Sequence, residues 1–322
     1  MTQSIVRFQA ETDMNYGSAP QERKLEDYIN LSVVVVEKSK GKTAHYISKR
    51  VKEIFEDILD PCKIGHLGQL DPPLTGLVGV SLARACKLSS FLTELDRKYT
   101  AWLHFNRFIP NEKVEKALEI FEGTIKQVPP VRSRSRRILR SKDIFKLELL
   151  EYRKKKAKIF IHCESGTYVR KLLQDIARYL AWGVKISGLR RVGIGPFTLK
   201  DAVSFRELAQ AYESAKNGSE EKLRQLLKPV EVCLEGFPSI YVQDSCIRLL
   251  CCGAPLFTRD IAKLDASIDG EKRVLVRSLK GEIVCVAMPV GTAEEIAQKE
   301  DNEIAAHPTR TIMSPYTYAM ET

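Results

Sequence analysis

In the first two thirds of the chain, apolar runs typical of strands alternate with segments in which apolar residues recur at helical spacing. Four consecutive valines over 33–36 are typical of a buried strand, because β-branched residues fit a pleated, covered surface. Apolar residues then recur at helical spacing behind Thr43, a good N-cap, which predicts a helix over 44–59. The same patterns predict strands over 77–82, 99–105, 144–151 and 157–163, and helices over 86–92, 114–121 and 167–180. This mixture indicates an α+β domain.

The pattern changes in the last third of the chain. Residues 208–227 are charged and predict a mostly helical connection. After Pro238, short apolar runs at 240–242, 273–278 and 282–287 alternate with turn residues, which predicts a small β-rich domain. We therefore expect a flexible N-terminal segment, an α+β domain, a β-rich domain and a loose tail. Their expected bounds are 1–24, 25–237, 238–314 and 315–322.

The net charge of +10 comes from one segment of the 322 residues. Residues 126–158 hold thirteen Lys or Arg and three acids, so the rest of the chain is balanced. A lysine-rich cluster over 153–158 is equally well explained as a solvated hairpin tip. The other cluster is made of arginines, which suit bidentate phosphate contacts and base stacking. It favours a polyanionic partner, RNA or DNA, through Arg132, Arg134, Arg136 and Arg137.

Several classes of protein are excluded by composition. No apolar run approaches the length that a membrane helix needs, and the polar, acid-containing start does not fit a secretory signal. Eight cysteines occur without a C-x-x-C pair, which indicates reduced thiols in an intracellular protein and argues against structural zinc. Serine-triad, H-E-x-x-H and paired-carboxylate patterns are also missing from the sequence.

The stretch 63–76 is the best candidate for a reactive loop. Its three glycines and two prolines favour a shaped loop over a helix, and Asp71 is its one acid. A surface turn with an Asx-type aspartate is an equally good interpretation from composition alone. His66 lies in the same loop, and a single histidine is more typical of a structural or hydrogen-bonding role than of a base.

Six short motifs occur in order along the chain: KSKGKTAH at 38–45, GHLGQLDPPLTG at 65–76, RKY at 97–99, QVPPVRS at 127–133, GTYVR at 166–170 and LRRVGIGPF at 189–197. Together they resemble the motifs of the TruB/dyskerin family of pseudouridine synthases. The resemblance extends from about 25 to 313, and residues 238–313 look like a PUA domain, an RNA-binding β-barrel. The chain departs from the family at Ser39 or Lys40, where proline is usual, and at Gln69, where threonine or alanine is usual. Neither departure removes a reacting group.

The resemblance implies a fold, a reaction and a site. The fold would be a mixed or antiparallel sheet with flanking helices, followed by the PUA barrel. The reaction would isomerise uridine to pseudouridine in RNA without a metal or cofactor. Asp71 would be the catalytic residue, as a nucleophile at C1′ or as a base on the sugar, two roles that the sequence does not distinguish. Tyr99 would stack on the extruded base, and Tyr168 and Leu189 would line the base pocket. Arg170 would pair with the aspartate, and His66 would bind RNA.

Each of these residues also has an ordinary structural interpretation, as a core aromatic, a packed leucine or a solvated arginine. Within the family, the long N-terminal segment and the PUA domain resemble the archaeal relative of dyskerin. That relative implies rRNA or tRNA substrates, an H/ACA guide RNA, three small accessory proteins and a cytoplasmic location. A stand-alone synthase acting on the tRNA T-loop is the alternative. A non-catalytic RNA-binding scaffold is the alternative of another class.

Overall fold

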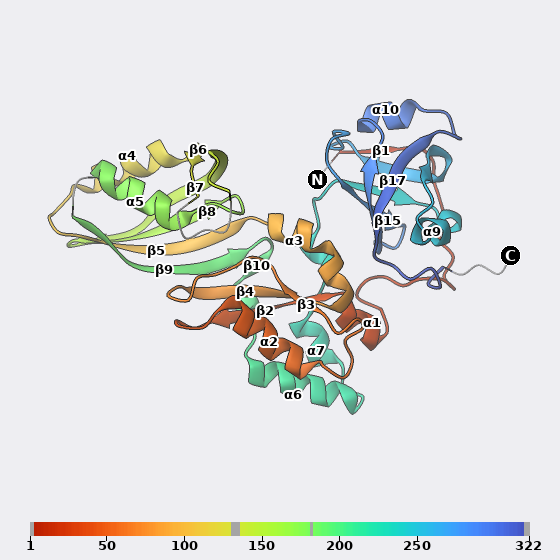
Figure 1. Ribbon diagram of the computed structural model, residues 1–322, viewed down its shortest axis with the longest axis horizontal. Helices are drawn as coiled ribbons and strands as arrows, with labels where there is room; N and C mark the ends of the chain where they lie inside the picture. The colour runs from red at the N-terminus through yellow and green to blue at the C-terminus, as the bar shows by residue number, and fades with distance from the viewer. Residues whose placement is uncertain (1–2, 130–135, 181–182, 319–322) are drawn as a thin grey trace.

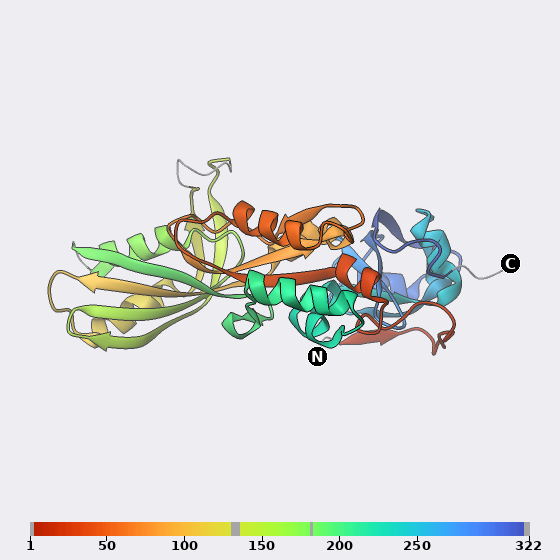
Figure 2. The ribbon, with the colours of Figure 1, turned by 90° about the horizontal axis from the view of Figure 1, so that it is seen from below.

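The computed structural model describes residues 3–129, 136–180 and 183–318, and it contains two β-sheets (Figure 1). A ten-stranded mixed sheet and its helices make up the larger part of the molecule. A seven-stranded sheet forms a separate unit at one end of the molecule. The view from below shows that the molecule is elongated (Figure 2). The predicted α+β class is confirmed. No helix of the described ranges is long and apolar enough to cross a membrane.

Strand order in the large sheet is β11-β2-β4-β9-β5-β8-β7-β6, with β10 paired to β9 and β3 paired to β4. In chain order the strands are β2 Ser32–Lys38, β3 Ile64–His66, β4 Thr75–Leu82, β5 Arg97–Phe105, β6 Gly123–Gln127, β7 Arg140–Arg153, β8 Lys156–Cys163, β9 Val184–Ile194, β10 Phe197–Thr198 and β11 Lys228–Pro229. The helices are α1 Leu25–Asn30, α2 Ala44–Ile54, α3 Ser89–Glu94, α4 Asn111–Phe121, α5 Val169–Leu180, α6 Phe205–Lys216, α7 Glu221–Leu226 and α8 Val230–Cys233.

The helices cover the sheet in two groups, each over its own apolar core. Helices α2 and α6 pack on the valines of β2 and β4, whereas α4 and α5 pack on β5, β8 and β9. Thr43 caps α2 as predicted, but the helix ends at Ile54, five residues before the predicted end. The predicted helix over 86–92 is instead a 3-10 turn, Ala83–Leu88, followed by α3. Strand β9 was not predicted, because two of its four buried residues are Arg191 and Gly193, which give no apolar signal.

The two halves of the large sheet meet where β4 runs parallel to β9. Only two residue pairs make this junction, Thr75 with Arg190 and Gly76 with Arg191. Gly76 has a φ of +113°, and a Cβ there would lie 2.1 Å from the carbonyl oxygen of Arg191. Glycine is therefore required at this crossing. Because β3 and β4 form a hairpin around the loop 67–74, the junction lies directly beside that loop.

The C-terminal unit is a barrel-like sheet that also includes the N-terminal segment. Its strands are β1 Ser4–Val6, β12 Ser239–Val242, β13 Leu256–Phe257, β14 Ile261–Asp265, β15 Val274–Ser278, β16 Ile283–Pro289 and β17 Ile304–Thr311, with α9 Asp244–Cys251 and α10 Ala293–Gln298. Strand β1 pairs antiparallel with β14. Further along, Thr12 and the amide of Asp13 donate to Asp244, and the amide of Ser18 donates to Glu282, so the expectation of a flexible segment is wrong for residues 3–24. Its short, weakly periodic sequence gains order from pairing with a strand far along the chain.

The expected loose tail is also corrected as far as residue 318. Tyr318 is 1% exposed within the core of the barrel, and its hydroxyl donates to the Glu282 carboxylate at 2.6 Å. A further apolar core joins the barrel to the large sheet, because Leu275 and Ile283 pack with Phe91 and Leu234. The barrel is thus docked firmly against the larger part of the chain.

Candidate active site

The loop between β3 and β4 presents Asp71 on a tight turn. The amide of Leu74 donates to the Asp71 carbonyl at 3.0 Å, and the amide of Gly41 donates to the Pro72 carbonyl at 2.7 Å. These bonds fix the backbone on both sides of the aspartate. The Asp71 side chain is 45% exposed, so its carboxylate can be reached from outside the protein.

Arg170 lies in the first turn of α5 and donates from Nη2 to Oδ2 of Asp71. The expected contact between these residues, 99 positions apart, is therefore present. Both side chains are about half exposed, and pairs in that environment add little to stability. The ion pair matters for geometry instead, because a guanidinium fork holds a carboxylate in one orientation.

Two of the expected pocket residues, Tyr99 on β5 and Leu189 on β9, lie in the core beneath α5. Tyr99 is 9% exposed, and burial raises the pKa of its hydroxyl while the nearby guanidinium of Arg191 opposes the rise. The register between β5 and β9 shifts at Lys98 and Tyr99, and such bulges re-aim side chains next to functional sites.

The other two expected residues lie on either side of this group. Tyr168 immediately precedes α5, and its backbone exchanges two hydrogen bonds with the buried amide of Gln127, at 3.0 and 3.3 Å. Gln127 therefore fixes the start of the helix that carries Arg170. His66 ends β3, and its Nδ1 is buried without a hydrogen-bond partner in the described residues.

Three buried cations beneath the loop were not identified from the sequence. Lys38 is 0% exposed and donates to the carbonyls of Pro72 at 3.3 Å and Leu74 at 2.5 Å. Arg97 donates to the Leu67 carbonyl at 2.6 Å. Arg191 donates to the carbonyls of Gln69 at 3.0 Å and Gly68 at 3.4 Å.

Burial governs the protonation of all three groups, because a charge in a low-dielectric site is costly. It lowers the pKa of Lys38 and Arg191, and it lowers that of Arg97 to about 10. The Asp71 carboxylate partly offsets the effect of burial on the pKa of Lys38. All three cations lie inside the motifs quoted above. That position was the available signal, but charge counting treats lysine and arginine as surface residues.

The expected RNA-binding arginines are only partly within the described ranges. Arg136 and Arg137 are exposed just before β7, whereas Arg132 and Arg134 lie outside the described residues. The lysine-rich cluster forms the β7–β8 turn, as predicted, with Lys154 at a φ of +52°.

The sequence was compared with models of known families. The TruB family pseudouridylate synthase N-terminal domain matches residues 56–110, and the tRNA pseudouridylate synthase B C-terminal domain matches residues 170–235. A DKCLD domain matches residues 1–48. The three models together therefore match the N-terminal segment and the part of the large sheet from β11 to β5, but not β6, β7 or β8.

Full-length relatives extend the likeness over the whole chain. A probable tRNA pseudouridine synthase B of Methanocaldococcus jannaschii is 39% identical over 98% of this chain and 92% of its own length. A counterpart in Korarchaeum cryptofilum is 36% identical over 92% of this chain and 91% of its own.

Solved structures agree with these sequences. The fold matches a chain in the crystal structure of a Cbf5-Nop10-Gar1 complex with a TM-score of 0.92 and 30% identity, covering 100% of this chain and 97% of that one. A chain from an H/ACA RNP bound to a substrate RNA containing 2′-deoxyuridine gives a TM-score of 0.89 and 29% identity, covering 99% and 96%. With this identity over its full length, and with Asp71 and Arg170 paired at the loop that the motifs define, the chain belongs to the TruB family of pseudouridine synthases.

Proposed function

We propose that this protein isomerises uridine to pseudouridine in RNA as the catalytic subunit of a guide-RNA (H/ACA) ribonucleoprotein. The observation that carries the proposal is the half-exposed Asp71 carboxylate paired with Arg170. Arg191 donates to the loop two residues before Asp71 and lies opposite Tyr99 in the β5–β9 ladder, which connects the two parts of the site. The agreement with Cbf5 over the whole chain supports the ribonucleoprotein assignment.

The chemistry requires one carboxylate and a pocket for a flipped base. The N1–C1′ bond of the uridine breaks, the base turns within the pocket, and C5 bonds to C1′; the C5 proton is lost and N1 takes up a proton, so the atoms of the nucleotide are conserved. Asp71 would attack C1′ or take a proton from the sugar. Flipping the nucleotide costs a few kcal/mol, and stacking on Tyr99 would return about 1–3 kcal/mol. Tyr168 and Leu189 would enclose the base, and His66 would contact the RNA beside it.

We further propose the division of labour along the chain. Residues 25–237 would form the catalytic domain, and residues 238–314 would form a PUA domain that holds the guide RNA. Small accessory proteins, such as the Nop10 and Gar1 named with the matched structure, would complete the particle. We place the protein in the cytoplasm, where reducing conditions suit its six buried free thiols, Cys86, Cys163, Cys233, Cys246, Cys251 and Cys285.

The proposal is tested by assaying tRNA and a guide-matched target RNA with the protein alone, with guide RNA, and with guide RNA plus accessory proteins. Chemical mapping of pseudouridine is the readout. Modification of the guided target only in the complete mixture would support the ribonucleoprotein role. Modification of tRNA by the protein alone would favour the stand-alone alternative, which the relatives named as probable tRNA pseudouridine synthases favour. Absence of product in every mixture would leave the scaffold alternative.

The exposed arginines before β7 give a quantitative prediction for RNA affinity. We expect Arg136→Gln and Arg137→Gln together to flatten the salt dependence of single-stranded RNA binding by roughly 1.4 units of log–log slope, at about 0.7 per phosphate contact. Filter binding between low and moderate salt measures the slope. Lys200→Gln, which removes one exposed cation outside the basic segment, is the control and should leave the slope unchanged. An unaltered slope in the arginine variant would identify these residues as a solvated surface.

Arg170 gives a prediction for catalysis. An ammonium cannot reproduce the planar fork that contacts the Asp71 carboxylate, although it keeps the positive charge. We expect Arg170→Lys to lower the single-turnover rate by about 100-fold, as loss of one preorganised electrostatic contact commonly does. Arg178→Lys on the same helix, whose ion pair with Asp175 is exposed, should be neutral. Wild-type turnover by Arg170→Lys would remove Arg170 from the site.

A further inference from the structure

Arg191 contacts the backbone that carries the catalytic aspartate. The residue lies on β9 and is 1% exposed, yet it is among the largest side chains of the buried interior. Its guanidinium donates to the Leu77 carbonyl at 2.7 Å and to the carbonyls of Gln69 and Gly68 in the loop. Gln69 and Gly68 precede Asp71 by two and three residues. The position of the loop just before Asp71 therefore depends on this side chain, whereas Lys38 and Arg97 hold its two ends.

The same guanidinium also interacts with Tyr99, the residue proposed to stack on the base. Arg191 and Tyr99 are opposite each other in the β5–β9 ladder. Each side chain affects the pKa of the other. Burial lowers the pKa of Arg191 and Tyr99 opposes that change, just as Arg191 opposes the burial-driven rise in the pKa of Tyr99. Arg191 thus connects the loop that carries Asp71 with the ring of Tyr99, and both of these must contact the same nucleotide.

The main chain leaves Arg191 little freedom to move. The nitrogen of Arg191 would lie 2.6 Å from a Cβ at Gly76, and its carbonyl oxygen would be closer still. Strand β4, which begins immediately after the loop, therefore rests on the backbone of Arg191. A displacement of β9 at this point would be transmitted to both the loop and Tyr99.

We propose that Arg191 is a positioning residue for the reaction, which fixes the Asp71 loop relative to the stacking ring of Tyr99. The inference rests on the proposed function, since it concerns where the carboxylate stands relative to a base on that ring. Arg191 would not touch the substrate. Its planar group with five donors spans carbonyls of the loop and of β4 at once, which a single ammonium cannot do.

A purely structural role would predict a different outcome, and the barrel supplies a matched control. Arg277 is 6% exposed and donates to the carbonyls of Leu234 at 3.0 Å and Gly281 at 3.2 Å, far along the chain from the loop. Arg191→Lys and Arg277→Lys thus remove the same kind of buried fork. Both should lower the melting temperature by similar amounts.

Single-turnover assays in the assembled ribonucleoprotein separate the two roles. We expect Arg191→Lys to lower the rate constant at saturating substrate by about 100-fold, because small misplacements of reacting groups cost that much. Its affinity for the RNA should stay at the wild-type value, and Arg277→Lys should retain the wild-type rate constant. The proposal is overturned if Arg191→Lys loses no more rate than Arg277→Lys, or if its defect lies only in RNA affinity.

A second measurement keeps the link testable if Arg191→Lys does not fold, or if the wild-type protein makes no pseudouridine. Tyr99→Phe removes only the hydroxyl next to Arg191. We expect it to speed hydrogen–deuterium exchange in a peptide covering 67–74, measured without RNA. Tyr152→Phe is the control, since that hydroxyl donates to the Ile109 carbonyl at 2.6 Å in the same half of the sheet. Exchange in 67–74 that is unchanged by Tyr99→Phe would overturn the link, whatever the reaction.

Discussion

Asp71→Asn is expected to abolish pseudouridine formation while the protein still folds and binds RNA. The amide has nearly the shape of the carboxylate but neither attacks C1′ nor accepts a proton from the sugar. Removing a group that acts directly on the reacting atoms commonly costs more than about 10³-fold in rate. The measurement is single-turnover conversion of a guided target in the complete particle, with RNA affinity determined in parallel.

The fold should survive this change, because the Asp71 side chain is about half exposed and its pair with Arg170 adds little to stability. Asp175→Asn is a suitable control. That carboxylate lies five residues beyond Arg170 on α5, accepts from Lys171 and Arg178, and should be dispensable for turnover. Wild-type product formation by Asp71→Asn would refute the enzymatic assignment, whereas loss of RNA binding would show that the residue acts before the chemical step.

Local sequence predicted the parts of the site that depend on short-range physics. The glycines and prolines around Asp71 give a loop, and the lysine run gives the β7–β8 turn. The helical spacing of Leu172, Leu173 and Ile176 orients α5 so that Arg170 lies outside the buried face of the helix. That Arg170 meets Asp71 depends on the order of the strands, and only the family resemblance indicated it.

The parts that were missed depend on contacts between distant segments. Lys38 and Arg191 are indistinguishable from surface cations in a charge count, because their partners are backbone carbonyls that carry no sequence signal. Strand β1 has three residues, too few for a periodic pattern, and it is ordered by β14. The same reason explains the errors at both ends of the chain, where the barrel orders segments that look polar and irregular.

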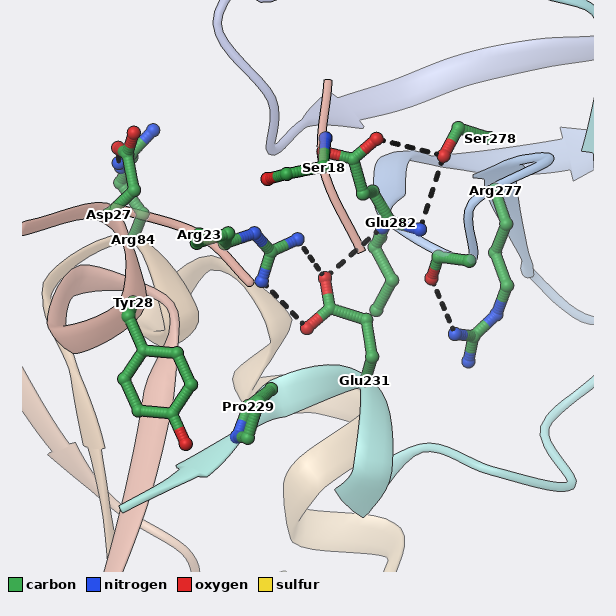
Figure 3. Close-up of polar contacts among 12 residues, drawn as sticks. Ser18, Arg23, Asp27, Tyr28, Arg84, Pro229, Glu231, Arg277, Ser278 and Glu282 are labelled. Carbon is green, nitrogen blue, oxygen red and sulfur yellow. Dashed lines mark hydrogen bonds and ion pairs between the residues drawn. The ribbon is translucent and has the colours of Figure 1, made fainter. Parts of the chain in front are cut away.

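Three buried acids, Asp244, Glu282 and Glu231, hold the N-terminal segment in place. Asp244 accepts from the amide of Asp13 at 2.8 Å, and Glu282 accepts from the amide of Ser18 at 3.2 Å. Glu231 on α8 accepts two bonds from Arg23, at 2.6 and 3.0 Å (Figure 3). It accepts a third from the amide of Ile283 on β16 at 3.2 Å. Glu231 thus joins the N-terminal segment, the end of the large sheet and the barrel at one point.

The Arg23–Glu231 pair should therefore be sensitive to the loss of either partner. Their side chains are 6% and 5% exposed. Burial alone would lower the pKa of Arg23, but the carboxylate of Glu231 outweighs that effect and the pKa is raised. We expect Glu231→Gln to reduce the free energy of unfolding by about 3–5 kcal/mol, because it leaves a buried guanidinium without its counter-charge. Urea unfolding, with proteolysis of residues 3–24 followed alongside, measures the change.

The double variant Arg23→Met/Glu231→Gln distinguishes an uncompensated charge from lost packing. It removes the cation as well, while the amide oxygen introduced by Glu231→Gln can still accept from the amide of Ile283. Replacing a whole buried pair is often close to neutral, so most of the stability should return. If the double variant is as unstable as Glu231→Gln, the loss comes from geometry at the junction and not from charge. If Glu231→Gln itself is as stable as the wild-type protein, the three-way contact contributes nothing to holding the N-terminal segment on the barrel.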